Sequence, residues 1–357
     1  FRRVLFRSMA EIRELPWNGY NVMSTFSGMG GSSLGYKMAG YKVLWANEFI
    51  PEAQNTYRLN HPTTILDPRD IRKIDPMEAL ASVGLKPGEL DLFDGSPPCS
   101  AFSTSGKREK GWGTVKKYSD SSQRVDDLFF EYVRFLKVIQ PKVFIAENVS
   151  GLVKGTAKGY FLLILSALKE CGYEVEVKLL NGKWLGVPQA RQRIIFMGVR
   201  KNLGLKPTHP KPLPYYYSIR DAIGDIQGAY VDPDAWVDRG ADTPTGEYSV
   251  AQKWRECKPG TNHPVRFQVR RSLWTEACHT LTATGFNPSA ASIMHPSECR
   301  KFSILEGKRL SGVPDDFELT GTYREKGERL GRLVPPVMMM HISKAAQVGI
   351  LDKLSNK

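Results

Sequence analysis

The chain has 357 residues, of which 41% are hydrophobic, so it can form one large domain or a large and a small one. Its 50 Lys and Arg residues outnumber 37 Asp and Glu residues, and the net charge of +13 indicates either a polyanionic partner such as nucleic acid or a generally basic surface. The five cysteines form no CxxC pair and no apolar run approaches the roughly 18 residues of a membrane span, which argues against a disulfide framework, a zinc site and a transmembrane helix.

The chain begins with an Arg-rich octet, Phe1–Ser8, which we interpret as an extension derived from cloning or from an upstream reading frame. From Asn21 the sequence predicts a strand, a Gly-rich turn, a helix over 32–39 and a second strand that ends at Glu48. In a nucleotide-binding βαβ unit, glycines admit the ligand and an acid about 20 residues later binds the ribose hydroxyls. A tight structural turn would also explain the glycines, but the spacing to Glu48 favours a ligand site.

A polar-apolar pair and a lone cysteine follow the next two predicted strands. A helix over 51–60 leads to a strand that ends near 64–66, and Asp70 and Ile71 come next. They could read an adenine edge, although Asp70 alone would also serve as a helix cap or a solvated loop acid. The fourth strand, 90–93, runs into Pro97-Pro98-Cys99, and ligands bind beyond the carboxyl ends of strands in doubly wound sheets.

Alternating helices and strands continue up to Arg200. A Ser-, Gly- and Lys-rich loop over 100–125 is expected to close over a phosphate backbone. Helices are then predicted over 126–139 and 160–171, and strands over 143–146, 174–180 and 194–199. This order predicts an α/β fold with a mostly parallel, doubly wound sheet, which brings Glu147 to the same edge as Cys99.

The composition changes after Arg200. Residues 201–300 are rich in Pro, Gly and Thr, which predicts a smaller, irregular second domain. Basic and aromatic residues alternate there, as in a nucleic-acid groove or, equally, a solvated face with core aromatics: Lys253, Trp254, Arg255, Lys258, Arg266, Phe267, Arg270, Arg271 and Trp274. A helical pattern resumes over 300–317. A final apolar helix over 335–354 is expected to pack on the first domain, with its Met run in the core.

Four side chains are expected to carry the chemistry: Cys99, Glu147, Arg191 and Arg193. Nearby arginines lower the pKa of a thiol and so favour a thiolate nucleophile. A carboxyl group beside the thiol can protonate or hydrogen-bond a heteroaromatic ring nitrogen during the attack. Without these neighbours, Cys99 would be interpreted as an inert buried thiol.

From residue 20 onward the chain resembles the DNA (cytosine-5) methyltransferase family in a series of segments: FSGMGG (26–31), NEF (47–49), DI (70–71), PPCSAFSTSG (97–106), ENV (147–149), QARQR (189–193), the segment over 300–317 that ends in LSGVPDDF (310–317), and VPP (334–336). The resemblance implies a Rossmann-like class I methyltransferase domain over 20–200, preceded by an N-terminal extension over 1–19. A target-recognition domain over 201–300 and a return segment with the C-terminal helix over 301–357 would follow.

The same resemblance implies a monomer that acts on double-stranded DNA in the cytoplasm of a bacterial or phage-infected cell, without a membrane or a metal. Cys99 would attack C6 of a cytosine flipped out of the duplex, and S-adenosyl-L-methionine would donate its methyl group to C5. Glu147 would hold the N3 and amino edge, and Arg191 with Arg193 would hold O2 and the active-site loop. The cofactor residues would be Phe26, Ser27, Gly28, Met29, Gly30, Gly31, Glu48, Phe49, Asp70, Ile71, Pro98, Arg332, Leu333 and Val334.

One residue departs from the family pattern. Before the last helix the family commonly has Gly-Asn, a small residue and Val-Pro, whereas this chain has Gly331-Arg332-Leu333-Val334-Pro335. The asparagine lies near the methionine end of the cofactor, so an arginine there needs a carboxylate to balance it. In one alternative, Arg332 pairs with a protein acid or points away from the cofactor. In the other, Arg332 binds the carboxylate of carboxy-S-adenosyl-L-methionine and the product is 5-carboxymethylcytosine.

Other functions stay open at this point. An RNA cytosine-5 methyltransferase, including the tRNA-modifying branch, would share the fold, although the second domain and the basic loop favour duplex DNA. A catalytically inactive DNA-binding regulator is disfavoured because the thiol, the acid and the arginines are all present. Restriction-modification, modification of a phage genome and regulation are all compatible with a DNA methyltransferase.

Overall fold

The computed structural model describes residues 7–98, 127–153, 157–226, 232–237 and 250–355, and the backbone of 115–117 and 122–124. Cys99 and most of the predicted loop over 100–125 lie outside the described residues. The chain forms two compact units: the sheet unit (Arg13–Leu180, Gln192–Lys211 and Met338–Lys357) and the second unit (Phe1–Ile12, Asn181–Arg191 and Pro212–Val337). The domain boundaries near residues 200 and 300 remain a prediction.

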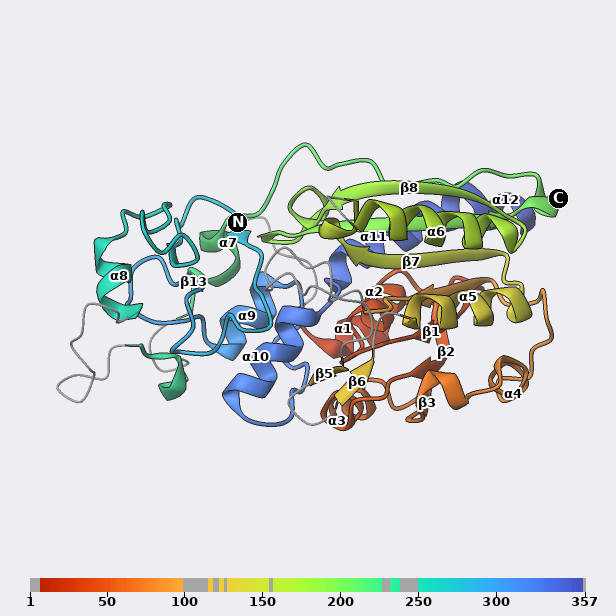
Figure 1. The fold of residues 1–357 in the computed structure, drawn as a ribbon, viewed down its shortest axis with the longest axis horizontal. Helices are drawn as coiled ribbons and strands as arrows, with labels where there is room; N and C mark the ends of the chain where they lie inside the picture. Colours follow the sequence, from red (N-terminus) through yellow and green to blue (C-terminus); the bar gives the residue numbers. More distant parts are fainter. Residues whose placement is uncertain are drawn as a thin grey trace. The chain divides into compact units, whose positions relative to one another are not determined.

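The sheet unit is built on a seven-stranded sheet with the order β3-β2-β1-β4-β7-β10-β8 (Figure 1). Its strands are β1 (Asn21–Thr25), β2 (Lys42–Asn47), β3 (Ile65–Asp67), β4 (Leu92–Gly95), β7 (Val143–Val149), β8 (Tyr173–Asn181) and β10 (Gln192–Arg200). The pairs β1–β2, β2–β3, β1–β4 and β4–β7 are parallel, and β10 is antiparallel to β7. The predicted mostly parallel α/β sheet is confirmed. Strand order reverses between β1 and β4, which is where doubly wound sheets bind ligands.

Helices pack on both faces of this sheet. They are α2 (Gly31–Met38), α3 (Pro51–Asn60), α4 (Pro76–Ala81), α5 (Leu128–Ile139), α6 (Ala157–Glu170), α11 (Pro336–Ala346) and α12 (Asp352–Ser355), with a π-turn over Gln347–Leu351. On α5, buried residues recur at helical spacing, and Tyr132 and Phe135 stack on Phe93 of β4 with ring centroids 4.8 and 6.2 Å away. Because strand side chains alternate, the next residue, Asp94, faces the opposite side, where Tyr36 of α2 reaches it.

The second unit consists of short elements, as the sparse periodicity predicts. They include α7 (Ile219–Ile223), α8 (Val250–Glu256), α9 (Ile304–Leu310), α10 (Tyr323–Arg332), β9 (Gln189–Ala190), β11 (Arg270–Arg271), β12 (Cys278–His279) and β13 (Ile293–Met294). Helices α7, α9 and α10 each begin with a capping box. The apolar pattern of the sequence did not predict α10. The Thr322-x-x-Glu325 box at its start is the signal that could have found it.

Candidate active site

The Gly-rich turn that follows β1 lies at the point where the strand order reverses. Phe26, Gly28 and Gly30 have positive φ angles of 54°, 56° and 93°. A Cβ atom on Gly30 would lie 2.2 Å from Nε2 of His61, whereas a Cβ atom on Gly28 would meet nothing within 4 Å. Packing therefore requires Gly30, while Gly28 leaves the backbone open to a ligand.

Glu48 lies beside this turn, where the spacing of the sequence places an acid. Its carboxylate is buried and accepts hydrogen bonds from the backbone N–H groups of Gly28 and Ile50, each at 2.7 Å. The neighbouring Asp70 accepts the N–H of Arg72 at 3.1 Å and caps a 3-10 turn over Ile71–Lys73. Its contacts match the alternative in which Asp70 is a cap. The cofactor roles of both acids remain predictions.

Glu147 and Arg193 form an ion pair at the edge where β7 ends and β10 begins. Nε of Arg193 lies 2.5 Å from Oε1 of Glu147, and their side chains are 12% and 9% exposed. Burial lowers the pKa of Arg193, and the charge of Glu147 opposes that effect. The next residue, Asn148, donates its Nδ2–H to the Pro97 carbonyl at 3.2 Å. The end of β7 thus holds the Pro97-Pro98 turn that leads into Cys99. This role of Asn148 could not be predicted from the sequence.

Arg191 belongs to the second unit and makes its described contacts there. It is 2% exposed, and its Nη1 and Nη2 atoms donate to the carbonyls of Leu281 and Gly331, each at 2.9 Å. These bonds tie β9 to the segment after β12 and to the last turn of α10. Its described contacts indicate a structural role, and its catalytic role remains a prediction.

Arg332 lies in the last turn of α10, where it pairs with an acid one turn earlier. Its Nη2 atom is 3.0 Å from Oε1 of Glu328, and the two side chains are 41% and 14% exposed. Leu333 and Val334, which follow, are buried. Glu328 therefore supplies the protein carboxylate that the first alternative for Arg332 requires. Their i,i+4 spacing would have indicated this pair if the helix had been predicted.

Comparison with known proteins identifies the family. The model of the protein family described as C-5 cytosine-specific DNA methylase matches residues 20–347 of this chain. The chain belongs to this family. The methylase is therefore a DNA (cytosine-5-)-methyltransferase, as the resemblance of its segments predicts.

Relatives match the methylase over most of their length. The type II methyltransferase M.NgoPII of Neisseria gonorrhoeae is 30% identical over 92% of this chain and 96% of that protein. M.PspPI of Psychrobacter sp. (strain TA137) is also 30% identical, over 92% of this chain and 79% of that protein.

Solved structures share the fold at lower identity. A protein described as a DNA modification methyltransferase encoded within an E. coli prophage has 22% identity and a TM-score of 0.73, covering 95% of this chain and all of that one. The Spodoptera frugiperda DNMT2 mutant has 18% identity and a TM-score of 0.64, covering 95% of this chain and 100% of that one.

Proposed function

We propose that the methylase modifies a cytosine flipped out of duplex DNA, with Cys99 as the nucleophile. The base must leave the stack because its C6 and C5 atoms are unreachable within the duplex. The Cys99 thiolate forms a bond to C6, and the ring electrons displaced toward C5 make that carbon nucleophilic. After C5 has taken the methyl group, a base removes the C5 proton and the Cys99–C6 bond breaks. Cys99 is regenerated and the product is 5-methylcytosine.

The Glu147–Arg193 pair is the observation that carries this proposal. A buried carboxylate and guanidinium 2.5 Å apart, beside the strand end that holds Pro97, present an acceptor and donors to a planar heterocycle. Glu147 would bind the N3 and amino edge of the cytosine. Arg193 would bind O2, and Arg191 would support the active-site loop. A protonated Glu147 would donate to N3 and draw electrons from C6 during the attack.

The family uses S-adenosyl-L-methionine, and the Gly-rich turn fits such a ligand. Gly28 is open, and Glu48 lies beside it with an acceptor set suited to ribose hydroxyls. When bound, the cofactor supplies an electrophilic methyl group on a sulfonium. Phe26, Ile71 and Pro98 would enclose it, and Asp70 would read the adenine. The remaining contacts would come from Ser27, Met29, Gly30, Gly31, Phe49, Leu333 and Val334.

The group that is transferred depends on Arg332. Glu328 balances its charge, which favours an ordinary methyl donor. An exposed i,i+4 pair is worth only about 0.3–0.5 kcal/mol, however, so a ligand carboxylate could compete with Glu328 for the guanidinium. This weak pairing keeps carboxy-S-adenosyl-L-methionine as a second candidate cofactor.

We expect DNA treated with the methylase and S-adenosyl-L-methionine to contain 5-methylcytosine, and carboxy-S-adenosyl-L-methionine to give no product. Mass spectrometry of the nucleosides after each reaction checks this result, and parallel reactions with tRNA test the RNA alternative. Appearance of 5-carboxymethylcytosine would contradict the methyl assignment. In that case Arg332→Asn should abolish the carboxymethyl product and keep the methyl product, because the amide cannot pair with a carboxylate as a guanidinium does.

A loop of the second unit has the properties of a DNA contact. Its tip carries Val265 and Phe267, whose exposed fractions are 81% and 66%. Nδ1 of His263 accepts the N–H groups of Val265 and Arg266 at 3.2 and 2.9 Å, and its Nε2–H therefore donates to Glu256 at 2.6 Å. The hydrogen bond to His263 holds the pKa of Glu256 below its usual range. The backbone is thus fixed while two apolar side chains face water.

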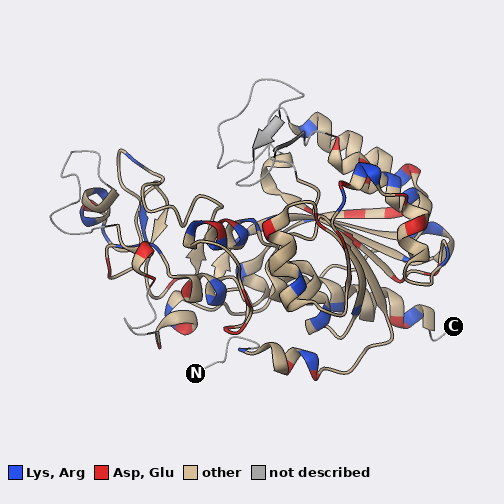
Figure 2. Ribbon diagram, turned by 90° about the horizontal axis from the view of Figure 1, so that it is seen from below, with Lys and Arg blue, Asp and Glu red and all other residues tan. Residues whose placement is uncertain are grey.

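The surroundings of this loop, which we call the 263–269 loop, favour duplex DNA as its partner. Basic residues lie next to it on α8 and β11, and Figure 2 marks the basic residues in blue. Arg271 stacks on Trp254, 4.2 Å from the ring centroid, and Trp254 is buried in a small core with Val269. Trp254 is therefore a core aromatic, whereas Phe267 is exposed. Apolar tips of this kind contact thymine methyl groups or wedge between bases.

Phe267→Ala is expected to weaken DNA binding by about 1–3 kcal/mol, or about 5- to 160-fold, and to leave folding unchanged because the ring is exposed. Binding of a duplex followed by fluorescence anisotropy at fixed salt measures the loss, and thermal unfolding checks the fold. Leu163→Ala is the matched control, since Leu163 is an equally exposed apolar residue of the sheet unit, at 58%. Equal affinity of the two variants would exclude the 263–269 loop from the DNA interface.

A further inference from the structure

Asp94 is a buried acid at the carboxyl end of β4 that the proposed chemistry does not use. It is 1% exposed and precedes Cys99 by five residues in the chain. Its Oδ2 atom accepts the hydroxyl of Ser24 at 2.7 Å, and its Oδ1 atom accepts the hydroxyl of Tyr36 at 3.0 Å. Both hydroxyls point their hydrogens at one carboxylate, which is the arrangement that a charged acceptor favours.

Further hydrogen bonds extend this contact to the Gly-rich turn. The hydroxyl of Ser27 donates to the carbonyl and the hydroxyl oxygens of Ser24, each at 3.1 Å. On the same strands, Thr25 Oγ1 donates to the Asp94 carbonyl at 3.2 Å, and Ser96 Oγ donates to the Phe26 carbonyl at 3.0 Å. Phe26 has a φ of 54°, a conformation that L residues adopt only when neighbours hold them there. The segments over 24–27 and 94–96 are thus bonded side by side.

We propose that ionised Asp94 is a positioning residue that holds the Gly-rich cofactor turn and the segment over 94–98, which precedes Cys99, in their productive arrangement. The proposal rests on the proposed function, because the first segment carries predicted cofactor contacts and the second leads into the predicted nucleophile. A charged carboxylate can only accept hydrogen bonds, so the Ser24 hydroxyl must donate its hydrogen to Asp94. The Ser24 oxygen is then left to accept the hydrogen bond from Ser27. A protonated Asp94 must donate one bond, so the Ser24 or the Tyr36 hydroxyl must turn away.

The carboxyl group of Asp94 changes between its protonated and ionised forms near neutral pH. Burial raises the pKa of Asp94 to about 7, the hydrogen bonds from Ser24 and Tyr36 oppose that rise, and the charge of Glu147 adds to it. Tyr36 of α2 and Tyr57 of α3 lie on the side of the sheet that Asp94 faces, and Tyr132 of α5 lies across the sheet within electrostatic reach of Asp94. Burial raises the pKa of each phenol, so all three stay neutral when Asp94 titrates. Glu147 faces it from β7. Activity should therefore fall as the pH drops through about 7.

The test is the pH profile of kcat, measured by methyl incorporation into DNA, for the whole methylase and for Asp94→Asn. We expect the wild type to lose activity below about pH 7. Asp94→Asn should be about 10- to 100-fold slower at pH 8, the effect of losing hydrogen bonds to a charged group, and this difference should shrink about tenfold at pH 6, where only about a tenth of the wild-type Asp94 is ionised. Tyr36→Phe, which removes one bond to the charged form, should move the acid limb of the profile to higher pH.

The buried acid that immediately precedes β4 provides the control. Asp91 accepts Lys142 Nζ at 2.7 Å and the N–H of Asn21 at 2.9 Å, at the opposite end of β4. Asp91→Asn should lower stability without changing the shape of the profile. An Asp94→Asn enzyme that is slowed equally at every pH, or that keeps the acid limb, would overturn the proposal. Failure of the wild type to form a covalent complex with 5-fluorocytosine DNA would instead contradict the proposed function.

Discussion

Replacing Cys99 with alanine is expected to abolish methyl transfer to DNA while folding and DNA binding stay intact. Without the thiolate, C6 is not attacked and C5 never becomes nucleophilic, so the reaction loses its covalent route. Loss of a covalent nucleophile in other enzymes lowers kcat by about six orders of magnitude. Incorporation of a labelled methyl group from S-adenosyl-L-methionine measures the loss. The covalent complex with a 5-fluorocytosine duplex should disappear at the same time.

A second thiol separates the role of Cys99 from a general sensitivity to cysteine loss. Cys171 is a free thiol of the sheet unit, and burial raises its pKa, so it is a poor nucleophile. Cys171→Ala should keep both turnover and trapping. Methylated DNA produced by Cys99→Ala would show that another group attacks the base.

Much of the sheet unit could be predicted from the sequence because its elements repeat strong local patterns. The helix over 51–60 has the predicted bounds, and the helices near 128–139 and 157–170 differ from the prediction by a few residues. The antiparallel direction of β10 could not be predicted in this way, because a buried strand has the same apolar pattern in either direction. That direction sets Arg193 opposite Val149, which follows Glu147 by two residues and therefore lies on the same face of the strand.

The contacts that surround the candidate site were harder to predict. The spacing of 20 residues was enough to pair Gly28 with Glu48, because the βαβ unit fixes that distance. The hydrogen-bond partners of Asp94 could not be predicted from the sequence, because Tyr36 and Ser24 lie 58 and 70 residues away along the chain and only the fold brings them together. The pairing of Glu328 was not predicted for a local reason, namely that its helix is polar and has only Tyr323 and Leu330 as large apolar residues. Predicting a long-range polar contact requires the topology of the fold, whereas predicting the local Glu328–Arg332 pair would have required only the helix.

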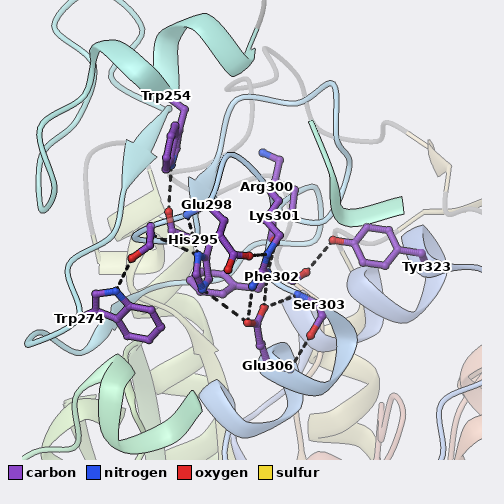
Figure 3. A network of polar contacts seen from close by, with 11 residues as sticks. Trp254, Trp274, His295, Glu298, Arg300, Lys301, Phe302, Ser303, Glu306 and Tyr323 are labelled. Carbon is purple, nitrogen blue, oxygen red and sulfur yellow. Dashed lines mark hydrogen bonds and ion pairs between the residues drawn. The ribbon is translucent and has the colours of Figure 1, made fainter. Parts of the chain in front are cut away.

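Glu306→Gln is expected to lower the free energy of unfolding of the second unit by about 3–5 kcal/mol, because it leaves a buried cation without its counter-charge. Glu306 lies at the centre of the polar network in Figure 3, and its two oxygens accept Nη1 and Nη2 of Arg300 at 2.7 and 2.8 Å. Both side chains are 2% exposed. Glu298 also holds Nε of Arg300, but it is 43% exposed, so it compensates in part and the loss should lie near 3 kcal/mol. Urea unfolding and hydrogen exchange of α9 measure the effect.

The chain offers a matched control, because Glu306 also closes the capping box of α9 with Ser303, and Glu325 closes the same box with Thr322 on α10. Glutamine can replace glutamate in a capping box, so Glu325→Gln should cost well under about 1 kcal/mol. The difference between the two variants then reports the buried ion pair. Adding Arg300→Met to Glu306→Gln removes the unpaired cation and should restore more than half of the lost stability. If the two single variants lost equal stability, the capping box and not the ion pair would carry the contribution of Glu306.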